Sequence, residues 1–376
     1  MPDKISLPRL LLKSLVLFLI ANLALGWLTP AGKESISLSR ISAYNHLFPG
    51  RLRLPYGEKP EQAYNLSLFD LRSMFASHAI AGAEQEYRVV ILGDSSVWGF
   101  LLRPEETLSA QLNAMQLTTA DGRPAVFYNL GYPTMSLTKD LLILQQALEY
   151  EPHLILWLVT LESFPRDKQI ASPIVQHNAR QVRELITDYR LALDTDDAGF
   201  INPTIWSRSL IGQRRAIADQ LRLQLYGVLW AATGIDQYYP QEYDPPQSDL
   251  AADLSFHSLQ NPATVEELQE GLAVDVLAAG VELAGSVPVV FVNEPVYISQ
   301  GANSHIRYNF FYPQWAYDQY RQMLATTCEQ NGWEYLDVWD IVPREEFTNS
   351  AIHLTPRGEA MLADRLAQAL SELWGR

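Results

Sequence analysis

The chain has 376 residues, of which 48% are apolar and 19% are charged, and its formal net charge is −15. This composition is typical of a packed globular protein and excludes an intrinsically disordered chain. So acidic a protein is not expected to bind nucleic acid, because its surface would repel the phosphates. Its single cysteine, Cys328, excludes an internal disulfide.

The N-terminus carries a candidate membrane segment. Lys4, Arg9 and Lys13 precede an uncharged apolar run from Ser14 to Leu28. A basic flank before such a run predicts that the N-terminus stays inside and that the following chain is exported. The run is shorter than the ~20 residues of a typical span, but no clean cleavage site follows it. We expect residues 1–30 to form an uncleaved single-pass signal anchor in the cell membrane, with a cleaved signal peptide as the alternative.

Residues 31–84 lack strong periodicity and are punctuated by Pro, Gly and Ser, which predicts a stalk with short helical turns. From residue 85 onward, short β-branched runs alternate with helical patterns. The runs predict strands at Arg88–Leu92, Val126–Leu130 and His153–Val159, and the patterns predict helices at Leu108–Leu117 and Thr138–Tyr150.

The alternation stops at about residues 165–260, which carry helical patterns at Ala179–Leu193 and Ile211–Leu229. This stretch is too long for a connection inside a compact domain, so we predict a helical insertion. Its apolar patch at Leu223–Ala232 is either an ordinary packing face or a contact with membrane or a partner.

The alternation then resumes to the end of the chain. Strands alternating with helices predict a mostly parallel sheet with helices on both faces, which is a three-layer α/β/α sandwich. Residues 85–376 are therefore expected to form one α/β domain that contains the insertion. The remaining predicted elements are a helix from Thr264 to Ala284, a strand at Val287–Val292, a helix at Pro313–Gln330, a strand at Glu334–Val338 and a helix at Arg357–Leu373.

Polar residues follow the predicted strands, and in such sheets ligands collect at the carboxyl ends of the strands. The first strand is followed by Gly93-Asp94-Ser95-Ser96, and a late loop ends in His353. A serine on a tight glycine-led turn can act as a nucleophile, and a late histidine can act as its base. The alternative interpretation is that Ser95 only caps a helix and that His353 is structural.

Three blocks of the sequence resemble the SGNH (GDSL-like) superfamily of esterases and acyltransferases. ILGDSSVWG resembles its G-D-S block, NLGYP its N-x-G block, and SAIHLTPRG its histidine block. The resemblance spans residues 87–373 apart from the insertion, and it implies a flavodoxin-like α/β/α fold. It also implies that Ser95 is the nucleophile and His353 the base. The Gly131 amide would be an oxyanion donor or only permit a tight turn, and Asp94 would hold the nucleophile turn.

Two positions depart from the family pattern. Glu162 stands where the third block usually offers an asparagine amide to the oxyanion hole, and it belongs either to the site or to a salt bridge. A negative charge ~4 Å from an oxyanion is unfavourable by about 4 kcal/mol at an effective dielectric constant near 20. The last block usually begins with aspartate but begins here with Ser350. The candidates for orienting His353 are Ser350, Asp337, Asp340 and Glu346.

The stretch 293–312 follows the fourth strand and is polar and aromatic. We interpret it as a substrate-binding wall, with an ordinary surface loop rich in Asn and Gly as the alternative. The candidate binding residues are Asn293, Glu294, Asn303, His305, Arg307, Tyr308 and Asn309.

Together these features predict a membrane-anchored, extracytoplasmic esterase or O-acyltransferase. The resemblance implies acyl esters of cell-surface glycans as substrate and a membrane-bound O-acyltransferase as partner. One alternative is a carbohydrate-binding or assembly subunit whose turnover the Glu162 and Ser350 changes have disabled. Another is a secreted lipase, with Leu223–Ala232 as its candidate lid. The sequence contains no metal-ligand cluster, phosphate-binding loop or dinucleotide fingerprint, so we expect no metal and no cofactor.

Overall fold

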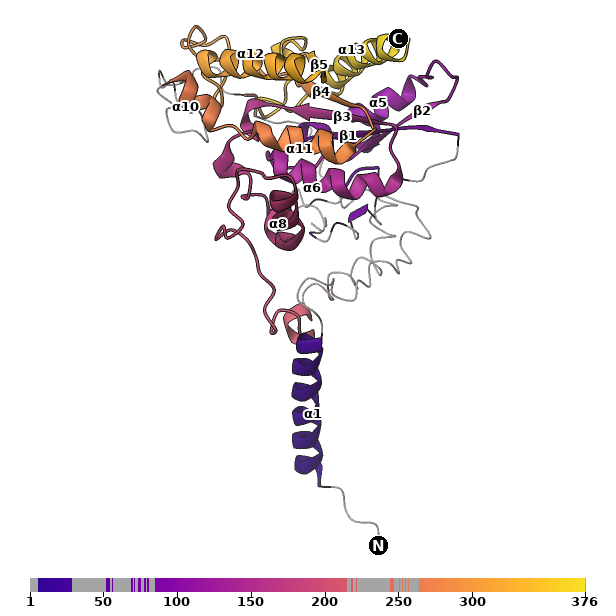
Figure 1. Cartoon of the computed structure of the whole chain (residues 1–376), viewed down its shortest axis with the longest axis vertical. Coiled ribbons are helices and arrows are strands. Elements are labelled where there is room, and N and C mark those ends of the chain that lie inside the picture. The colour runs from indigo at the N-terminus through magenta and orange to yellow at the C-terminus, as the bar shows by residue number, and fades with distance from the viewer. Residues whose placement is uncertain are drawn as a thin grey trace.

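The computed structural model describes residues 6–28, 85–214 and 264–375, together with scattered residues between these ranges. Five parallel strands form one sheet in the order β2-β1-β3-β4-β5 (Figure 1). This is the flavodoxin-like strand order, and it confirms the predicted parallel sheet. Each predicted strand agrees with an observed one to within two residues at either end. The strands are β1 (Tyr87–Leu92), β2 (Ala125–Asn129), β3 (Leu154–Val159), β4 (Val289–Asn293) and β5 (Glu334–Asp337).

Helices cover both faces of the sheet. Side chains along each strand point alternately to opposite faces, so each face presents apolar side chains on which helices pack. Val90 and Trp157 lie in one hydrophobic cluster, whereas their neighbours Val89 and Leu156 lie in a second cluster. The first cluster includes residues of α6 (Leu137–Ala147), α8 (Ala179–Asp188), α11 (Val274–Ala284) and α12 (Gln314–Asn331). The second includes residues of α5 (Leu108–Ala114) and α13 (Pro356–Trp374). The predicted three-layer sandwich is confirmed.

The shorter elements lie in the connections between these strands and helices. They are α4 (Ser95–Trp98), α7 (Pro173–His177), α10 (Val265–Glu270) and the 3-10 helices η2 (Pro104–Glu106), η3 (Leu148–Tyr150), η4 (Leu161–Ser163), η5 (Arg166–Lys168) and η6 (Arg344–Glu346).

The helix predicted from Thr264 to Ala284 is two helices, α10 and α11. Thr264 opens α10 with the expected capping box, in which its hydroxyl accepts from the Glu267 N–H at 3.1 Å. The helix then stops because residues 271–273 bond to a distant segment. The Gly271 carbonyl accepts from Arg166, and the Ala273 N–H donates to Phe164. These tertiary contacts replace the helical bonds that the local pattern favoured.

The N-terminal helix α1 (Leu7–Leu28) projects from the α/β domain (Figure 1). Its most apolar window has a mean hydropathy of 2.0, so the helix is long and apolar enough to cross a membrane. It begins seven residues before the predicted run, because Leu7 to Lys13 continue the helix into the basic flank.

Part of the segment predicted as a stalk packs against the α/β domain. Leu54, Met74 and Phe75 are buried in the larger hydrophobic cluster. The Arg53 guanidinium donates to the carbonyls of Gly99 at 2.8 Å and Leu102 at 3.1 Å. The stalk interpretation is therefore wrong for these residues, whose apolar side chains and one arginine complete the domain.

Only part of the predicted insertion belongs to the described residues. The helix predicted at Ala179–Leu193 ends at Asp188 as α8, and Arg190 follows it with a φ of 55°. The patch Leu223–Ala232 and most of Ile211–Leu229 lie outside the described residues. The division of the chain at residues 30, 84, 165 and 260 stays a prediction.

Candidate active site

Ser95 lies at the carboxyl edge of the sheet, where β1 leads into the short helix α4. Asp94 is the N-cap of this helix, and its carboxylate accepts from the Ser96 N–H at 2.8 Å. Asp94 therefore holds the turn, as an N-cap residue does when it satisfies a free amide of the first helical turn. Ser95 is partly exposed and Ser96 is buried, so Ser95 is the serine that a substrate can reach.

His353 meets Ser95 from a loop 258 residues later in the chain. Its Nε2 lies 2.8 Å from the Ser95 Oγ. The loop is fixed by a hydrogen bond from the Thr348 N–H to the His353 carbonyl at 2.8 Å, and the ring of Phe100 stacks on the imidazole with centroids 5.0 Å apart. The structure thus brings together the two residues predicted as nucleophile and base, at the distance that proton transfer requires.

Asn349, which sequence analysis missed, orients the imidazole. Its Oδ1 lies 2.8 Å from the His353 Nδ1, so this nitrogen donates a proton and Nε2 is left to accept from Ser95. The arrangement is Ser–His–Asn, with a neutral amide in the place of the usual carboxylate. Asn349 stands one residue before Ser350, where the family pattern places the orienting group. The signal available in the sequence was its side-chain amide, which can accept a hydrogen bond from the imidazole.

The four predicted orienting residues are not hydrogen-bonded to His353. Asp337 accepts from Asn293 at 2.9 Å and from Arg321 at 2.7 Å, and Glu346 accepts from Thr355 and pairs with Arg357. The prediction of these two carboxylates is wrong because nearer partners occupy them. The position next to the His353 Nδ1 is taken by Asn349, so the prediction is also wrong for Ser350 and Asp340.

The environment of His353 keeps its ring neutral. Burial lowers the pKa of His353 to about 4, and the Asn349 amide supplies no negative charge to oppose this shift. The imidazole is therefore in the basic form at pH 7, although its low pKa makes it a weaker proton acceptor than one near 7.

We expect reaction at Ser95 to persist down to about pH 5 and to fall only below the His353 pKa of about 4. In Asn349→Asp a carboxylate would stabilise the imidazolium, so the acid limb should move toward neutral pH. In Asn349→Ala the imidazole loses its orienting bond, and the rate should fall by about 10²-fold. The measurement is the pH profile of covalent labelling at Ser95. An acid limb that stays in place in Asn349→Asp would contradict the role of Asn349.

Gly131 is packed against the nucleophile helix, but its amide is already engaged. Its N–H donates to the Asn129 Oδ1 at 3.0 Å, so the prediction of Gly131 as an oxyanion donor is wrong. The Asn129 Nδ2 donates to the Val97 carbonyl at 2.7 Å, which ties β2 to α4. A Cβ on residue 131 would collide with the Trp98 backbone nitrogen, so glycine is required by this close approach.

Glu162 forms a salt bridge. The side chain is fully buried, and its carboxylate pairs with the Lys168 ammonium six residues later. Lys168 offsets the negative charge that, unpaired, would oppose an oxyanion nearby. Of the two interpretations of Glu162, the structure shows the ion pair.

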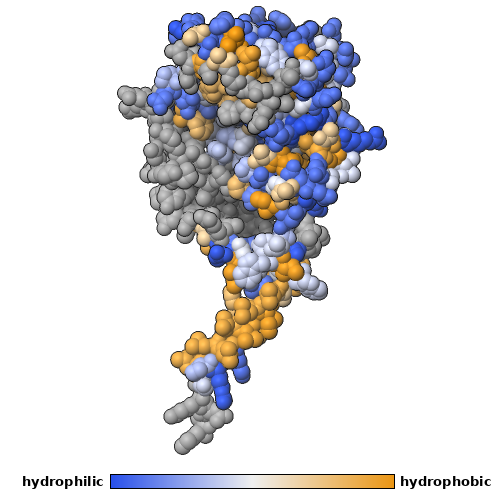
Figure 2. Space-filling view, turned by 90° about the vertical axis from the view of Figure 1, so that its left-hand side faces the viewer, coloured by the Kyte–Doolittle hydropathy of each residue, from blue (hydrophilic) through white to orange (hydrophobic). Residues whose placement is uncertain are grey.

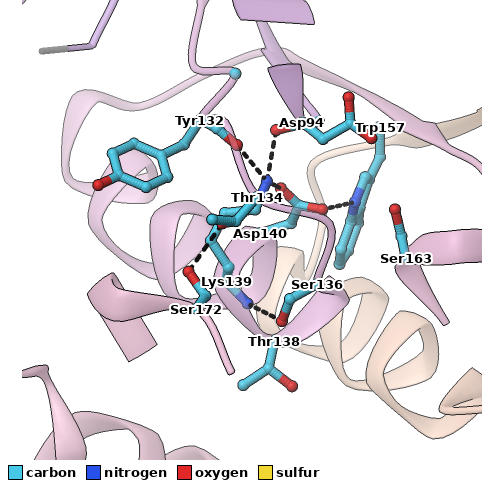
Figure 3. A network of polar contacts seen from close by, with 12 residues as sticks. Asp94, Tyr132, Thr134, Ser136, Thr138, Lys139, Asp140, Trp157, Ser163 and Ser172 are labelled. Atoms are coloured by element: carbon cyan, nitrogen blue, oxygen red, sulfur yellow. Dashed lines mark hydrogen bonds and ion pairs between the residues drawn. The ribbon is translucent and has the colours of Figure 1, made fainter. Parts of the chain in front are cut away.

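A buried lysine connects the turn before Ser95 to the loop after β2 (Figure 3). The Lys139 ammonium donates to the carbonyls of Gly93 at 2.6 Å and Tyr132 at 3.1 Å, and it pairs with Asp140 at 2.5 Å. The other oxygen of Asp140 accepts from the Trp157 indole at 3.2 Å. Sequence analysis missed Lys139. The signal was a cation in the first turn of a helix, where the helix dipole disfavours it.

A cavity of about 10 Å³ lies behind the nucleophile helix, lined among others by Ser96, Glu294 and Glu359. This is about the room that one water molecule needs. The Ser96 hydroxyl donates to Glu294, while Oε1 of Glu294 and Oε2 of Glu359 have no partner among the described residues. Burial raises the pKa of Glu294 well above its usual range and the pKa of Glu359 to about 8. Glu359 is therefore mostly protonated at pH 7.

The Glu359 pKa predicts a dependence of stability on pH. Between about pH 4.5 and pH 8 this carboxyl is protonated in the folded chain and ionised in the unfolded chain. Its contribution to the free energy of unfolding should thus fall by about 1.4 kcal/mol per pH unit across that window, and level off above pH 8. Urea unfolding of Glu359→Gln should lack this decrease. Parallel pH profiles for the variant and the wild type would contradict the assignment.

Most of the predicted substrate-binding wall is internal structure. Asn293, Glu294, Arg307 and Asn309 are buried, and their bonds join parts of the fold, so the prediction is wrong for them. For example, Asn309 donates to the Tyr297 carbonyl and accepts from two amides of its own loop. Two others are partly exposed: Asn303 donates to the Leu250 carbonyl, and Tyr308 donates to Asp318. For His305, which is exposed, binding stays a prediction.

Comparisons with known proteins find a general likeness in structure. No family model and no curated relative matches the chain. A putative lipolytic protein of the G-D-S-L family from Desulfitobacterium hafniense is similar at 10% identity and a TM-score of 0.37, covering 75% of this chain and 99% of that one. A lipase/acylhydrolase from Enterococcus faecalis is similar at 14% identity and a TM-score of 0.37, covering 76% of this chain and 95% of that one.

A carbohydrate acetylesterase from Sinorhizobium meliloti is similar at 12% identity and a TM-score of 0.34, covering 77% of this chain and 100% of that one. Identities and scores this low establish neither the family nor the activity of this chain. What its own coordinates show is a parallel α/β sandwich of flavodoxin-like strand order. It carries a Ser–His–Asn arrangement at the carboxyl edge of its sheet.

Proposed function

We propose that the chain is a membrane-anchored serine esterase or O-acyltransferase of the SGNH type, acting on acyl esters outside the cytoplasm. The observation that carries this proposal is the 2.8 Å approach of the His353 Nε2 to the Ser95 Oγ, with Asn349 on the opposite ring nitrogen. Ser95 is partly exposed at the edge of the sheet where ligands bind in open α/β folds.

The chemistry follows from these three side chains. The Ser95 Oγ attacks the acyl carbonyl carbon while its proton passes to the His353 Nε2. The tetrahedral intermediate collapses, the bond to the leaving alcohol breaks, and His353 returns the proton to that alcohol. Water or an acceptor hydroxyl then attacks the Ser95 acyl ester, with His353 again taking a proton and passing it to the Ser95 oxygen. Asn349 keeps the proton on Nδ1 throughout, so that Nε2 stays available.

The location and the glycan substrate rest on the N-terminal pattern and on the resemblance of the motifs. Lys4, Arg9 and Lys13 precede the uncharged apolar run from Ser14 to Leu28, which favours a domain on the outer side. The resemblance of the motifs to membrane-anchored SGNH proteins implies envelope polysaccharides, so cell-surface glycans are the proposed substrate class. A membrane-bound O-acyltransferase is the proposed partner.

Turnover by the full chain in nanodiscs tests the proposal. With p-nitrophenyl acetate as donor, release of p-nitrophenol without added acceptor is expected for an esterase. With an oligosaccharide added as acceptor, mass spectrometry would detect its acetylated form if acyl transfer competes with hydrolysis. His353→Ala is the matched control, and equal turnover in that variant would contradict the mechanism.

A second candidate is a carbohydrate-binding or assembly subunit without turnover. It is favoured by the engaged Gly131 amide and by the Glu162 carboxylate in the place of an oxyanion amide. Each missing donor lowers the rate by about 10²–10³-fold. Oligosaccharide binding by a folded chain that neither turns over p-nitrophenyl acetate nor takes up a serine-directed probe would favour this candidate.

A further inference from the structure

The C-terminal part of α1 packs against a segment that lies up to 189 residues later in the chain. Asn22 is fully buried there, and its Oδ1 accepts from the Ile211 N–H at 2.9 Å. Gly26 lies one turn further along the helix, and a Cβ at this position would collide with the Ile205 carbonyl oxygen. Figure 1 shows this segment at the end of α1 that faces the domain. The helix is thus docked against the rest of the chain as well as tethered to it.

The position of this contact along α1 sets its depth in a membrane. Helical residues rise 1.5 Å each, so the stretch from Leu10 to Leu28 is ~28 Å long, and the uncharged stretch from Ser14 is ~22 Å long. The hydrocarbon layer is about 30 Å thick. A layer that begins beside Arg9 or Lys13 therefore extends to the C-terminal end of the helix. In a layer that begins beside Arg9, Asn22 lies ~20 Å and Gly26 ~26 Å from the inner boundary, so both residues, with the segment packed on them, lie in the outer half of the layer.

The docked segment exposes large apolar side chains beside the polar Asn202, Thr204 and Ser207. The large exposed side chains here are Ile201, Ile205, Trp206 and Leu210, and Trp206 is 53% exposed. Trp27 and Leu28, at the C-terminal end of α1, are also exposed. Figure 2 shows hydrophobic atoms along α1 and at its junction with the domain. Tryptophan is enriched at membrane–water interfaces, where one part of the ring is apolar and the other is wet.

Several backbone groups of the segment have hydrogen-bond partners, which lowers the cost of contact with hydrocarbon. The Ser209 hydroxyl donates to the Trp206 carbonyl at 2.6 Å and accepts from the Gly212 N–H at 3.1 Å. The Ile211 N–H, at the start of the helical residues 210–214, donates to Asn22. The asparagine thus supplies to this amide the partner that lipid lacks, which gives a reason for a polar residue in so apolar a helix.

We propose that residues 201–212 are an interfacial membrane anchor, in which Ile205, Trp206 and Leu210 insert into the outer leaflet beside α1. The docking of α1 through Asn22 and Gly26 holds this segment at the bilayer surface and so fixes the height of the α/β domain. The anchor is independent of the chemistry at Ser95.

Spin labelling of the full chain in nanodiscs of phosphatidylcholine and phosphatidylglycerol tests the anchor. The chain suits this method because its single cysteine, Cys328, is buried, and burial raises the pKa of its thiol to about 12. A nitroxide on Trp206→Cys should collide with oxygen and be protected from a water-soluble nickel chelate, as one on Leu28→Cys should. A label on Gln330→Cys, exposed on α12, should show the opposite preference.

A label at residue 206 that behaves like the label at 330 would overturn the proposal. Protection from both reagents would also overturn it, because a protein partner or second copy would then cover the segment. Gly26→Leu should expose the residue-206 label to nickel, whereas Ala21→Leu, on the exposed face of α1, should leave it in lipid. A residue-206 label that stays in lipid in Gly26→Leu would refute the docking role of α1. Unchanged probe labelling at Ser95 would show that each variant is folded.

Discussion

Replacing Ser95 by alanine is expected to abolish covalent labelling by a fluorophosphonate probe and to lower ester turnover by about 10⁴-fold or more. The Ser95 Oγ lies 2.8 Å from the His353 Nε2, so its proton can leave as the probe attaches. The measurement is the intact mass of the full chain after labelling, with p-nitrophenyl acetate turnover beside it.

The neighbouring Ser96 provides the matched control. Its hydroxyl is buried and donates to Glu294, so Ser96→Ala should keep the label on Ser95. His353→Ala should lose most of the labelling, because the serine then lacks a base. A well-folded wild-type chain that takes up no label would contradict the catalytic proposal and would favour a binding subunit.

Replacing Lys139 by methionine is expected to lower the free energy of unfolding by about 3–5 kcal/mol. The ammonium is fully buried and has three oxygen partners, the carbonyls of Gly93 and Tyr132 and the carboxylate of Asp140. The variant leaves two buried carbonyls and one buried carboxylate without this donor. Urea unfolding of the full chain in detergent, followed by tryptophan fluorescence, measures the effect.

The size of this effect should depend on pH. Burial raises the pKa of Asp140 to about 6 even though the nearby Lys139 charge acts to lower it. Without Lys139 the folded-state pKa rises further, so ionisation of Asp140 opposes folding more strongly. The destabilisation should be smallest near pH 4, where the carboxyl is protonated in the folded wild type and in the folded variant alike, and grow toward pH 7.

Arg180→Met is the control for Lys139→Met. Arg180 pairs with Glu184 on the surface at 3.7 Å, and its loss should change the unfolding free energy by less than about 0.5 kcal/mol. Equal effects of the two substitutions would mean that the Lys139 contacts contribute no more than a surface pair. Lys139→Met should also slow labelling at Ser95, since Gly93 leads into the nucleophile turn.

The strands, the parallel sheet, the apolar N-terminal helix and the Ser95 and His353 pair could all be predicted from the sequence. Each is encoded locally, either by the periodicity of apolar residues or by a short motif at the end of a strand. Ser95 and His353 follow strands of one parallel sheet, whose carboxyl ends share one edge, so the topology itself brings them together.

The partners of the site residues were decided only by the tertiary structure. Whether Asn349 or Ser350 faces His353 depends on the path of one loop, and the sequence predicted the wrong neighbour. The Gly131 amide and the 293–312 loop were interpreted as binding elements, yet most of their polar groups bond within the fold. A sequence gives the type of each polar group. It does not give the direction in which the group points in the fold or the partner with which it forms a hydrogen bond.

The same reason explains which other contacts the sequence did not predict. Among them are the hydrogen bonds of Arg53, Lys139 and Asn22. Their partners are distant along the chain and come near only when the helices and the sheet have packed. The sequence by itself thus determined the elements, their order and the two reacting side chains. The tertiary structure decided their hydrogen-bond partners, because burial forces each polar group to pair with whichever neighbour the packing supplies.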